Sequence, residues 1–165
     1  MKALTIRTEP LSGDAGRVRK LVEATGFFRP DEADVAEELV LERLGKGLAS
    51  GYHFLFVDAS NEDRLDGYAC YGPAPCTVGT FDLYWIAVHP EAQGRGLGRE
   101  LFEAVAAAAL EQGGRILIAE TSSRPQYAPT RRFYDRCGCE VGAIVREFYD
   151  VDDDKVIYTR KLARP

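Results

Sequence analysis

The chain has 165 residues, a length that suits one domain with a substantial core. Hydrophobic residues make up 45% and charged residues 28%, which is typical of a globular protein in water. The formal net charge of −5 argues against non-specific nucleic-acid binding, because that needs a basic face. No apolar run approaches the roughly 20 residues that span a membrane, and the first residues lack the apolar core of a signal peptide. We therefore predict a cytoplasmic protein with no nucleic-acid or membrane partner.

The first quarter of the chain predicts a strand and two helices. Residues 3–8 alternate between apolar and polar types, which favours a short strand. Apolar residues then recur at helical spacing over Val18–Thr25 and again over Ala36–Leu44. Between these helices, Phe27 and Phe28 lie on a connector, where they either cover the core or line a cleft.

The middle of the chain predicts three strands in succession. They are expected at Tyr52–Ala59, Asp66–Gly72 and Phe81–Val88, which are rich in aromatic and β-branched residues. The connections between them are short, so we expect an antiparallel meander. His89 and Pro90 end the third strand.

The second half alternates helices with strands before ending in a hairpin. A helix is expected from Leu97 to Ala108, a buried strand at Arg115–Glu120 and a short helix through 133–134. Two last strands are expected at Glu140–Phe148 and Lys155–Lys161. The predicted order is β-α-α-β-β-β-α-β-α-β-β, a mixed α/β (α+β) fold.

The loop between the third strand and its following helix is the most informative segment. Val88–Gly98 reads V-H-P-E-A-Q-G-R-G-L-G, with glycines at 94, 96 and 98. Glycine allows positive φ and close approach to a ligand, so we expect all three to help the helix N–H groups converge on an anion. Arg95 and Arg99 add positive charge. This loop predicts a phosphate site.

The cysteines do not predict a metal site. The chain has four, at 70, 76, 137 and 139, and the spacing Cys137-Gly-Cys139 differs from the C-x-x-C of zinc and redox sites. We expect free thiols and no bound metal. Cys76, in a proline-containing loop, is a candidate pocket residue.

A dinucleotide site is the main rival for the glycine loop. Glu120, at the end of the next strand, lies where a ribose-binding acid would be expected. Two features oppose this interpretation: Arg99 stands where the third glycine of G-x-G-x-x-G should be, and the upstream strands are antiparallel. A P-loop is excluded, because the loop has no G-K-[ST].

Two motifs match a known family better. The pattern Q-x-x-G-x-G at Gln93, Gly96 and Gly98, preceded by I-A-V-H-P, resembles the GNAT superfamily of acyl-CoA-dependent N-acyltransferases. The second motif, F-Y-D-R-C-G-C at Phe133–Cys139, is similar to the helix signature of that family. The resemblance covers nearly the whole chain. It implies the GNAT fold, with a single mixed, mostly antiparallel sheet flanked by helices, and one N-acetyltransferase domain over residues 1–165.

The resemblance also implies acetyl-CoA as cosubstrate and assigns residues to it. The strand residues expected beside pantetheine are Ile86, Ala87 and Val88. The residues expected around the pyrophosphate are Gln93, Gly94, Arg95, Gly96, Leu97, Gly98 and Arg99. Tyr127 stands where the family often has an asparagine, and Arg132, Ser122 or Ser123 could replace that amide. Cys139 likewise stands where the family usually has phenylalanine.

For catalysis, the resemblance implies that Tyr134 protonates the coenzyme A thiolate as a general acid. A primary amine is mostly protonated at neutral pH, so a general base is also needed. Asp82, on the strand before the loop, is the first candidate, and Glu120, on the neighbouring strand, is the second. On strand alternation Asp82 shares a face with Tyr84. The resemblance also implies that a backbone N–H near 86–88 stabilises the oxyanion.

The acceptor is left open by the sequence. Its expected walls are Phe27, Phe28, Arg29, Cys76 and Tyr84, together with Tyr127. The acidic balance favours a cationic small-molecule or peptide amine, such as a polyamine, an aminoglycoside or a lysine side chain, whereas Arg29 and Arg124 would favour an acceptor with a carboxylate. A non-catalytic acyl-CoA-binding module and an NAD(P)-dependent oxidoreductase remain alternatives. A homodimer through the C-terminal strands is also open.

Overall fold

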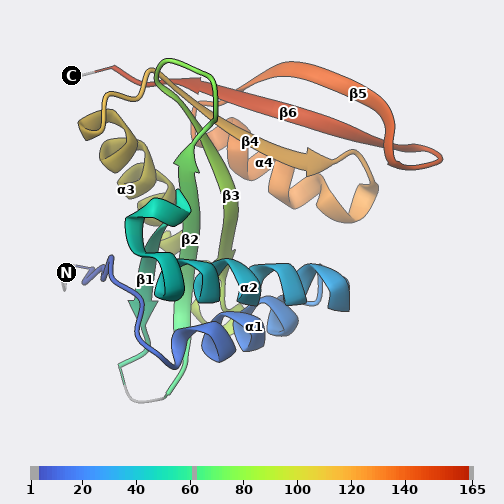
Figure 1. Cartoon of the computed structure of the whole chain (residues 1–165). Helices are drawn as coiled ribbons and strands as arrows, with labels where there is room; N and C mark the ends of the chain where they lie inside the picture. Colours follow the sequence, from blue (N-terminus) through green and yellow to red (C-terminus); the bar gives the residue numbers. More distant parts are fainter. Residues whose placement is uncertain (1–3, 61–62, 164–165) are drawn as a thin grey trace. The chain divides into compact units, whose positions relative to one another are not determined.

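The computed structural model describes residues 4–60 and 63–163. The helices and strands are α1 (Asp14–Thr25), α2 (Pro30–Lys46), β1 (His53–Asp58), β2 (Leu65–Pro73), β3 (Thr80–Val88), α3 (Leu97–Glu111), β4 (Ile116–Ser122), α4 (Ala128–Arg136), β5 (Glu140–Asp150) and β6 (Asp153–Lys161). Short 3₁₀ turns, η1 (Gly47–Ser50), η2 (Pro90–Ala92) and η3 (Pro125–Tyr127), connect some of them. Figure 1 traces these elements along the chain. Within the described part, no helix is long and apolar enough to cross a membrane.

The strands form one six-stranded sheet in the order β1-β2-β3-β4-β6-β5. β3 and β4 pair in parallel, from Thr80 opposite Ile116 to Leu83 opposite Ala119. The pairs β1–β2, β4–β6 and β5–β6 are antiparallel. The predicted fold class, a mixed and mostly antiparallel sheet flanked by helices, is confirmed.

The strand expected at residues 3–8 is reduced to one bridge. Residue 3 lies outside the described residues, and in the rest of the segment Arg7 alone bridges to β1, exchanging backbone hydrogen bonds of 2.9 and 2.8 Å with Phe56. Glu9 lies in a bend directly afterwards, so the segment leaves β1 after this single bridge.

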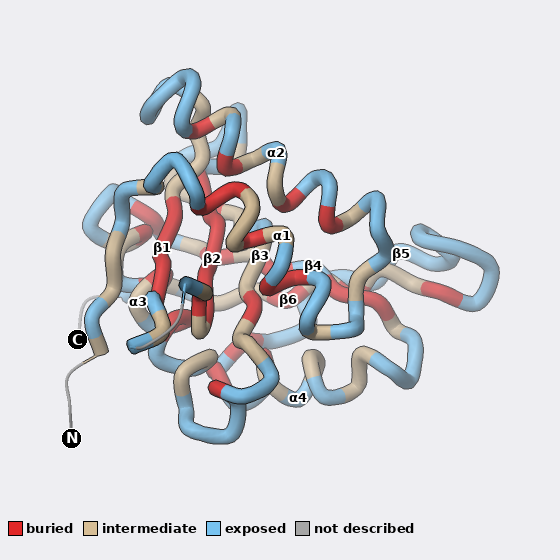
Figure 2. The backbone as a smooth tube through the Cα atoms, turned by 90° about the horizontal axis from the view of Figure 1, so that it is seen from below, coloured by how far each residue is buried: buried red, intermediate tan, exposed pale blue. Residues whose placement is uncertain are grey.

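The chain divides into two compact units that share two elements. Unit 1 comprises residues 1–72 and 85–102, and unit 2 comprises residues 73–84 and 103–165. β3 and α3 therefore each contribute residues to both units. The core of unit 1 lies between α1, α2 and the first two strands, and includes Val18, Val22, Val40, Phe56 and Tyr68. Figure 2 shows the buried runs along β1 and β2.

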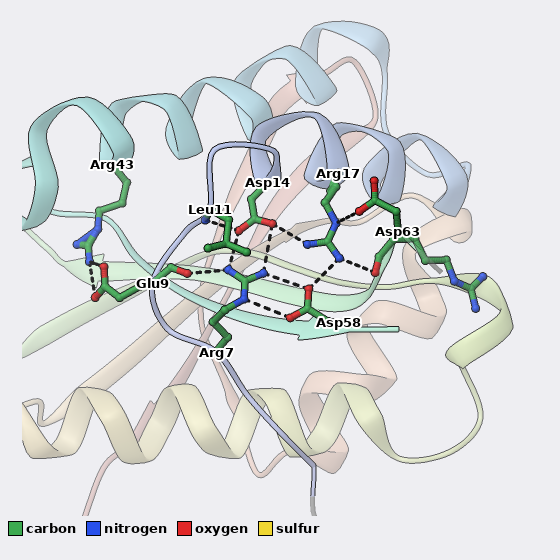
Figure 3. Close-up of polar contacts among 9 residues, drawn as sticks. Arg7, Glu9, Leu11, Asp14, Arg17, Arg43, Asp58 and Asp63 are labelled. Carbon is green, nitrogen blue, oxygen red and sulfur yellow. Dashed lines mark hydrogen bonds and ion pairs between the residues drawn. The ribbon is translucent and has the colours of Figure 1, made fainter. Parts of the chain in front are cut away.

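A buried ion-pair network fixes the start of unit 1 (Figure 3). The Asp14 side chain is fully buried at the start of α1 and accepts hydrogen bonds from Arg7 (2.6 Å), Arg17 (2.9 Å) and the backbone N–H of Leu11 (2.7 Å). Both arginines also pair with Asp58 at the end of β1. The network thus ties the N-terminal segment and α1 to β1.

In unit 2, alternate strand residues divide between a covered and a more open face of the sheet. The covered set is Phe81, Leu83, Leu117, Ala119 and Tyr158, all buried. The Tyr158 ring lies 5.3 Å from that of Tyr134, and Arg160 pairs with Glu103, so α4 and the later part of α3 cover this face. The opposite face carries Asp82, Ile118, Glu120 and Ile157, which are half-buried or exposed.

Candidate active site

The glycine loop leaves β3 through a hydrogen-bonded turn. The backbone N–H of His89 donates to Asp66 on β2 at 2.9 Å, and its ring Nδ1 accepts from the N–H of Glu91 at 3.3 Å, which caps η2. Gln93 then donates from its side-chain amide to the carbonyl of Val88 at 3.0 Å. The Gln93 side chain therefore closes the loop back onto the end of β3.

Two of the three glycines adopt backbone conformations that favour glycine. Gly94 has φ 76° and Gly96 has φ 83°, whereas Gly98 is the second residue of α3 and is helical. The prediction that all three glycines supply positive φ is therefore wrong for Gly98. A Cβ on Gly94 or Gly96 would meet nothing within 4 Å, so the backbone conformation, not crowding, calls for glycine there.

The loop and the start of α3 together fit an anionic ligand. The first N–H groups of a helix have no acceptor within it and carry partial positive charge. Arg95 and Arg99 are exposed on either side of this helix start, and Gln93 to Gly96 are exposed as well. This site is suited to binding a pyrophosphate. It combines the exposed backbone of the loop, the first N–H groups of α3 and the guanidinium groups of Arg95 and Arg99.

Gly67 on β2 is a functional position that the sequence did not reveal. A Cβ built there would lie 2.8 Å from Leu101 Cδ1 and 3.3 Å from the carbonyl oxygen of Ala87. The glycine therefore allows α3 to pack directly on β2 and β3, with Leu101 fully buried. An isolated glycine inside a strand pattern is the signal that could have identified it.

Arg64 is a second position that the sequence did not identify. Its Nη1 lies 3.1 Å from His89 Nδ1, and the guanidinium also pairs with Glu91 and with Asp66. His89 Nδ1 therefore lies beside both the Arg64 guanidinium and the backbone N–H of Glu91. This cluster fixes the chain on the approach to the glycine loop.

The aromatic residues between α1 and α2 have different environments. The Phe28 ring packs on Trp85 of β3, 4.9 Å between centroids, and covers the core. Phe27, by contrast, is exposed to 37%. Arg29 pairs with Asp31 at the start of α2 and takes part in its capping box.

The two candidate bases lie in unit 2, where they have different electrostatic surroundings. Burial, and then the charge of Glu120, raises the pKa of Asp82. Glu120 is more exposed, and its Oε2 lies 2.7 Å from the ammonium of Lys155. The same ammonium lies over the Phe148 ring, 3.6 Å from its centroid. Lys155 was not among the predicted site residues, because only the β4–β6 register brings it beside Glu120.

Tyr134 is buried in α4 among aromatic rings and thiols. Phe133 and Tyr158 lie 5.4 and 5.3 Å from its ring, and the Tyr134 side of the helix is covered by β6. Burial raises its pKa well above the usual tyrosine value, and the nearby Cys139 and Cys137 add to the shift. Tyr134 is therefore a neutral hydroxyl at any physiological pH.

The second motif, Phe133–Cys139, forms the C-terminal end of α4 and the turn that follows it. Gly138 has φ 73°, and the N–H groups of Cys137 and Cys139 both lie 3.1 Å from the carbonyl oxygen of Tyr134. The glycine therefore ends the helix in the left-handed conformation and returns the chain toward β5. Cys139 is buried beside Tyr134, and burial raises the pKa of its thiol to about 12. All four cysteines are free, and Cys76 is exposed with φ 61°.

Polar side chains in the segment before α4 form hydrogen bonds and ion pairs that connect the end of β4 to the start of β6. Ser122 Oγ contacts Asp153 and accepts from the N–H of Arg124, and Ser123 Oγ accepts from the N–H of Asp154. Arg124 pairs with Asp150 and Asp153. Three residues were predicted to replace the asparagine amide of the family. Arg132 is exposed. Ser122 and Ser123 instead make the contacts with Asp153 and Asp154. Tyr127, half-buried, is the N-cap of α4.

Comparison with known proteins establishes the family. The sequence model of the Acetyltransferase (GNAT) family matches residues 20–139, which include both the glycine loop and Tyr134. The chain belongs to this family. A mycothiol acetyltransferase from Gordonia bronchialis is 31% identical over 105 residues, 60% of this chain. The match spans about a third (32%) of that relative's length.

Solved structures agree with the family assignment. A member of the GNAT family from Desulfovibrio desulfuricans is 53% identical, with a TM-score of 0.94 over 98% of this chain and all (100%) of its own. The protein yncA from Salmonella typhimurium, whose structure contains acetyl-CoA, is 21% identical with a TM-score of 0.73, over 99% of this chain and 96% of its own. Because the identity is only 21%, the similarity to yncA concerns the fold alone.

Proposed function

We propose that this chain is an N-acetyltransferase that moves an acetyl group from acetyl-CoA to a primary amine by direct attack, without an acyl-enzyme. The observation that carries the proposal is the presence of both the glycine loop and a buried, neutral Tyr134 within the 20–139 family match. We further propose that residues 1–165 are one catalytic domain and that the enzyme works in the cytoplasm.

The residues of unit 1 are suited to hold the cosubstrate. The N–H groups at the start of α3, the loop Gln93–Gly98 and the guanidinium of Arg99 would bind the pyrophosphate. The backbone of Ile86–Val88 would pair with the pantetheine arm, as it does in the family. When bound, acetyl-CoA supplies an activated acyl group on sulfur. The chain must orient that acyl group, remove a proton from the amine and donate a proton to the leaving sulfur.

Asp82 is the better general base of the two carboxylates. A base must accept a proton near neutral pH, so a raised pKa suits it, and burial raises the pKa of Asp82. The Glu120 carboxylate is already engaged in an ion pair with the ammonium of Lys155, at 2.7 Å. We therefore assign proton removal to Asp82 and a supporting, electrostatic role to Glu120.

Tyr134 is assigned as the proton donor to the leaving sulfur. Its hydroxyl can donate a hydrogen bond, and then its proton, to the sulfur as negative charge develops there. In unit 2 the Tyr134 side chain lies on the covered face of the sheet with Tyr158, whereas Asp82 lies on the opposite face.

The acceptor is proposed to be a cationic amine, because the formal net charge of the chain is −5. Arg29 and Arg124, which would favour a carboxylate, are exposed and form ion pairs with Asp31 and with Asp150 and Asp153. Of the candidate wall residues, Phe27 is exposed in unit 1, and Tyr84 and Cys76 are exposed in unit 2.

The assignment is tested by Asp82→Asn and Tyr134→Phe, measured as thiol release with a panel of primary amines. Each variant should lose on the order of 10²-fold in turnover, while the affinity for coenzyme A measured by calorimetry stays within a few-fold. Glu120→Gln is the matched control and should retain most activity. Full activity in both variants would remove these residues from the mechanism. Coenzyme A binding without thiol release from the wild-type chain would favour the non-catalytic module.

A further inference from the structure

The ammonium of Lys155, on β6, is held by side chains of the two strands beside it. Glu120 of β4 places Oε2 2.7 Å from Nζ, and the ring centroid of Phe148 on β5 lies 3.6 Å from it. The Tyr149 ring lies 5.9 Å from Nζ and packs against Phe148 at an interplanar angle of 87°. A carboxylate and an aromatic face together form a good site for an alkylammonium ion. We call Glu120, Phe148 and Tyr149 the ammonium cluster.

The ammonium cluster is open to solvent, although the cation in it is nearly covered. The Lys155 side chain is 14% exposed, whereas that of Glu120 is 44% exposed. Phe148 and Tyr149 are 52% and 43% exposed. Lysine usually keeps its ammonium in water, but Lys155 lays it against the cluster. The groups around the cation are therefore accessible to a ligand.

A bulge in β5 sets the position of the two rings. The pairing register between β5 and β6 shifts between Val145 and Asp150, and within this stretch Glu147 has φ 48°. That left-handed conformation is rare for a residue with a side chain, and it persists only where the surroundings hold it. Here the backbone N–H of Glu147 donates to Asp154 Oδ1 at 3.0 Å, and the N–H of Asp154 donates to Ser123 Oγ at 2.8 Å. Held strain of this kind is concentrated at ligand-binding sites.

The ammonium cluster adjoins the proposed base on the open face of the sheet. Asp82 pairs with Ile118, two residues before Glu120 on β4, so the two carboxylates point to the same side. Burial, and then the charge of Glu120, raises the pKa of Asp82, so the two groups interact. When both are ionised they carry two negative charges, and Lys155 neutralises one of them. The remaining charge is matched by a single cation, which is the reacting amine.

We propose that the ammonium cluster is a subsite of the acceptor site and that Lys155 fills it, so that the enzyme selects amines with one positive charge. This inference rests on the proposed function, in which Asp82 removes the proton of the reacting amine. A second ammonium on the acceptor would meet the like charge of Lys155 where a carboxylate and a ring would otherwise receive it. Lys155 is therefore a specificity-determining residue that favours monoamines over polyamines.

Thiol-release kinetics with pairs of amines test this selectivity. Each pair contains an n-alkylamine and the α,ω-diamine of the same length, from three to six carbons. The wild type should have the higher kcat/KM with the monoamine in every pair. Lys155→Ala should raise the ratio of diamine to monoamine kcat/KM about ten-fold or more at the best length, chiefly through KM. An effect of the substitution on Asp82 cancels in this ratio, because both amines use the same base.

Two controls separate the position of the charge from its mere loss. Lys155→Arg keeps the cation and should keep the wild-type preference. Lys161→Ala removes the same charge from the exposed end of β6 and should leave the ratio unchanged. In the Lys155→Ala background, Glu120→Gln should abolish the gain, and Phe148→Leu should reduce it about three-fold. Circular dichroism verifies folding; should Lys155→Ala fail to fold, Lys155→Gln gives the same kinetic readout.

A titration with ethylammonium chloride, against sodium chloride at equal ionic strength, tests the cluster without acetyl transfer. Lys155→Ala should bind ethylammonium, with shifts of the Phe148 ring resonances in NMR spectra, and the wild type should not. A wild type that prefers diamines, an unchanged amine ratio in Lys155→Ala, a gain that survives Glu120→Gln, or no ethylammonium binding by Lys155→Ala would each overturn the proposal. Absence of thiol release from the wild type with every amine would instead contradict the proposed function, which the titration does not involve.

Discussion

Burial has opposite consequences for the two residues proposed to move protons. It raises the pKa of Asp82, so the carboxylate binds a proton at higher pH than an exposed aspartate would. It also raises the pKa of Tyr134, so the hydroxyl keeps its proton. Burial therefore makes Asp82 a stronger base, and Tyr134 a weaker acid, than the same side chains would be in water.

The electrostatic chain Asp82, Glu120 and Lys155 leads to a pH prediction. A base acts when deprotonated, so kcat/KM should fall as the pH decreases through the pKa of Asp82. Glu120→Gln removes a negative neighbour and should move this acidic limb to lower pH. Lys155→Gln leaves the charge of Glu120 uncompensated and should move the limb to higher pH. The measurement is the pH profile of kcat/KM with one amine.

Lys155→Arg is the matched control, because it keeps the positive charge beside Glu120 and should restore the wild-type profile. Equal shifts of the same sign in Glu120→Gln and Lys155→Gln would contradict the proposed coupling, as would an acidic limb that persists unchanged in Asp82→Asn. A purely structural role for Lys155 would lower activity at all pH values and leave the limb in place.

At the scale of elements, the position of the α3 N-terminus depends on a glycine in another element. Gly67 of β2 makes room for Leu101, and the fixed helix start holds the N–H groups that face the glycine loop. The loop motif describes the ligand-binding segment. The packing that positions this segment depends on β2, about 30 residues earlier in the chain.

Gly67→Ala should therefore destabilise the fold and weaken cosubstrate binding. The new methyl group would lie 2.8 Å from Leu101 Cδ1 and 3.3 Å from the Ala87 carbonyl oxygen, so α3 must move. We expect a loss of about 1–3 kcal/mol in the free energy of unfolding, and a higher KM for acetyl-CoA with a smaller change in kcat. Urea unfolding and steady-state kinetics measure the two effects.

Gly16→Ala is the matched control for this substitution. Gly16 lies within α1, and a Cβ there would meet nothing within 4 Å. Alanine should stabilise the helix by about 0.5–1 kcal/mol and leave KM unchanged. If Gly67→Ala behaves in the same way as Gly16→Ala, the close packing of α3 on β2 does not position the loop.

At the scale of the whole molecule, the sequence was informative where a local pattern determines structure. Strand periodicity predicted β1, β2 and β3 to within about two residues, and the glycine loop and the α4 motif led to the family. The strand predicted at residues 3–8 was too long, because an alternating pattern cannot show over how many residues a partner strand pairs with it. The Lys155–Glu120 pair and the space at Gly67 were missed, because both depend on contacts between segments far apart in the sequence.

The N-terminal segment shows the same limit and leads to a last prediction. Nothing in the local sequence marks Asp14 as more than an acid in the first turn of α1, yet its carboxylate is fully buried between two arginines (Figure 3). Asp14→Asn removes the negative charge and leaves Arg7 and Arg17 with Asp58 as their shared acid. Breaking a buried pair in this way should cost about 3 kcal/mol, a large share of the 5–15 kcal/mol typical of a domain. Urea unfolding should show this loss, whereas Asp31→Asn, at an exposed ion pair, should change stability little. Equal stabilities for the two variants would show that the buried network does not hold the N-terminal segment to β1.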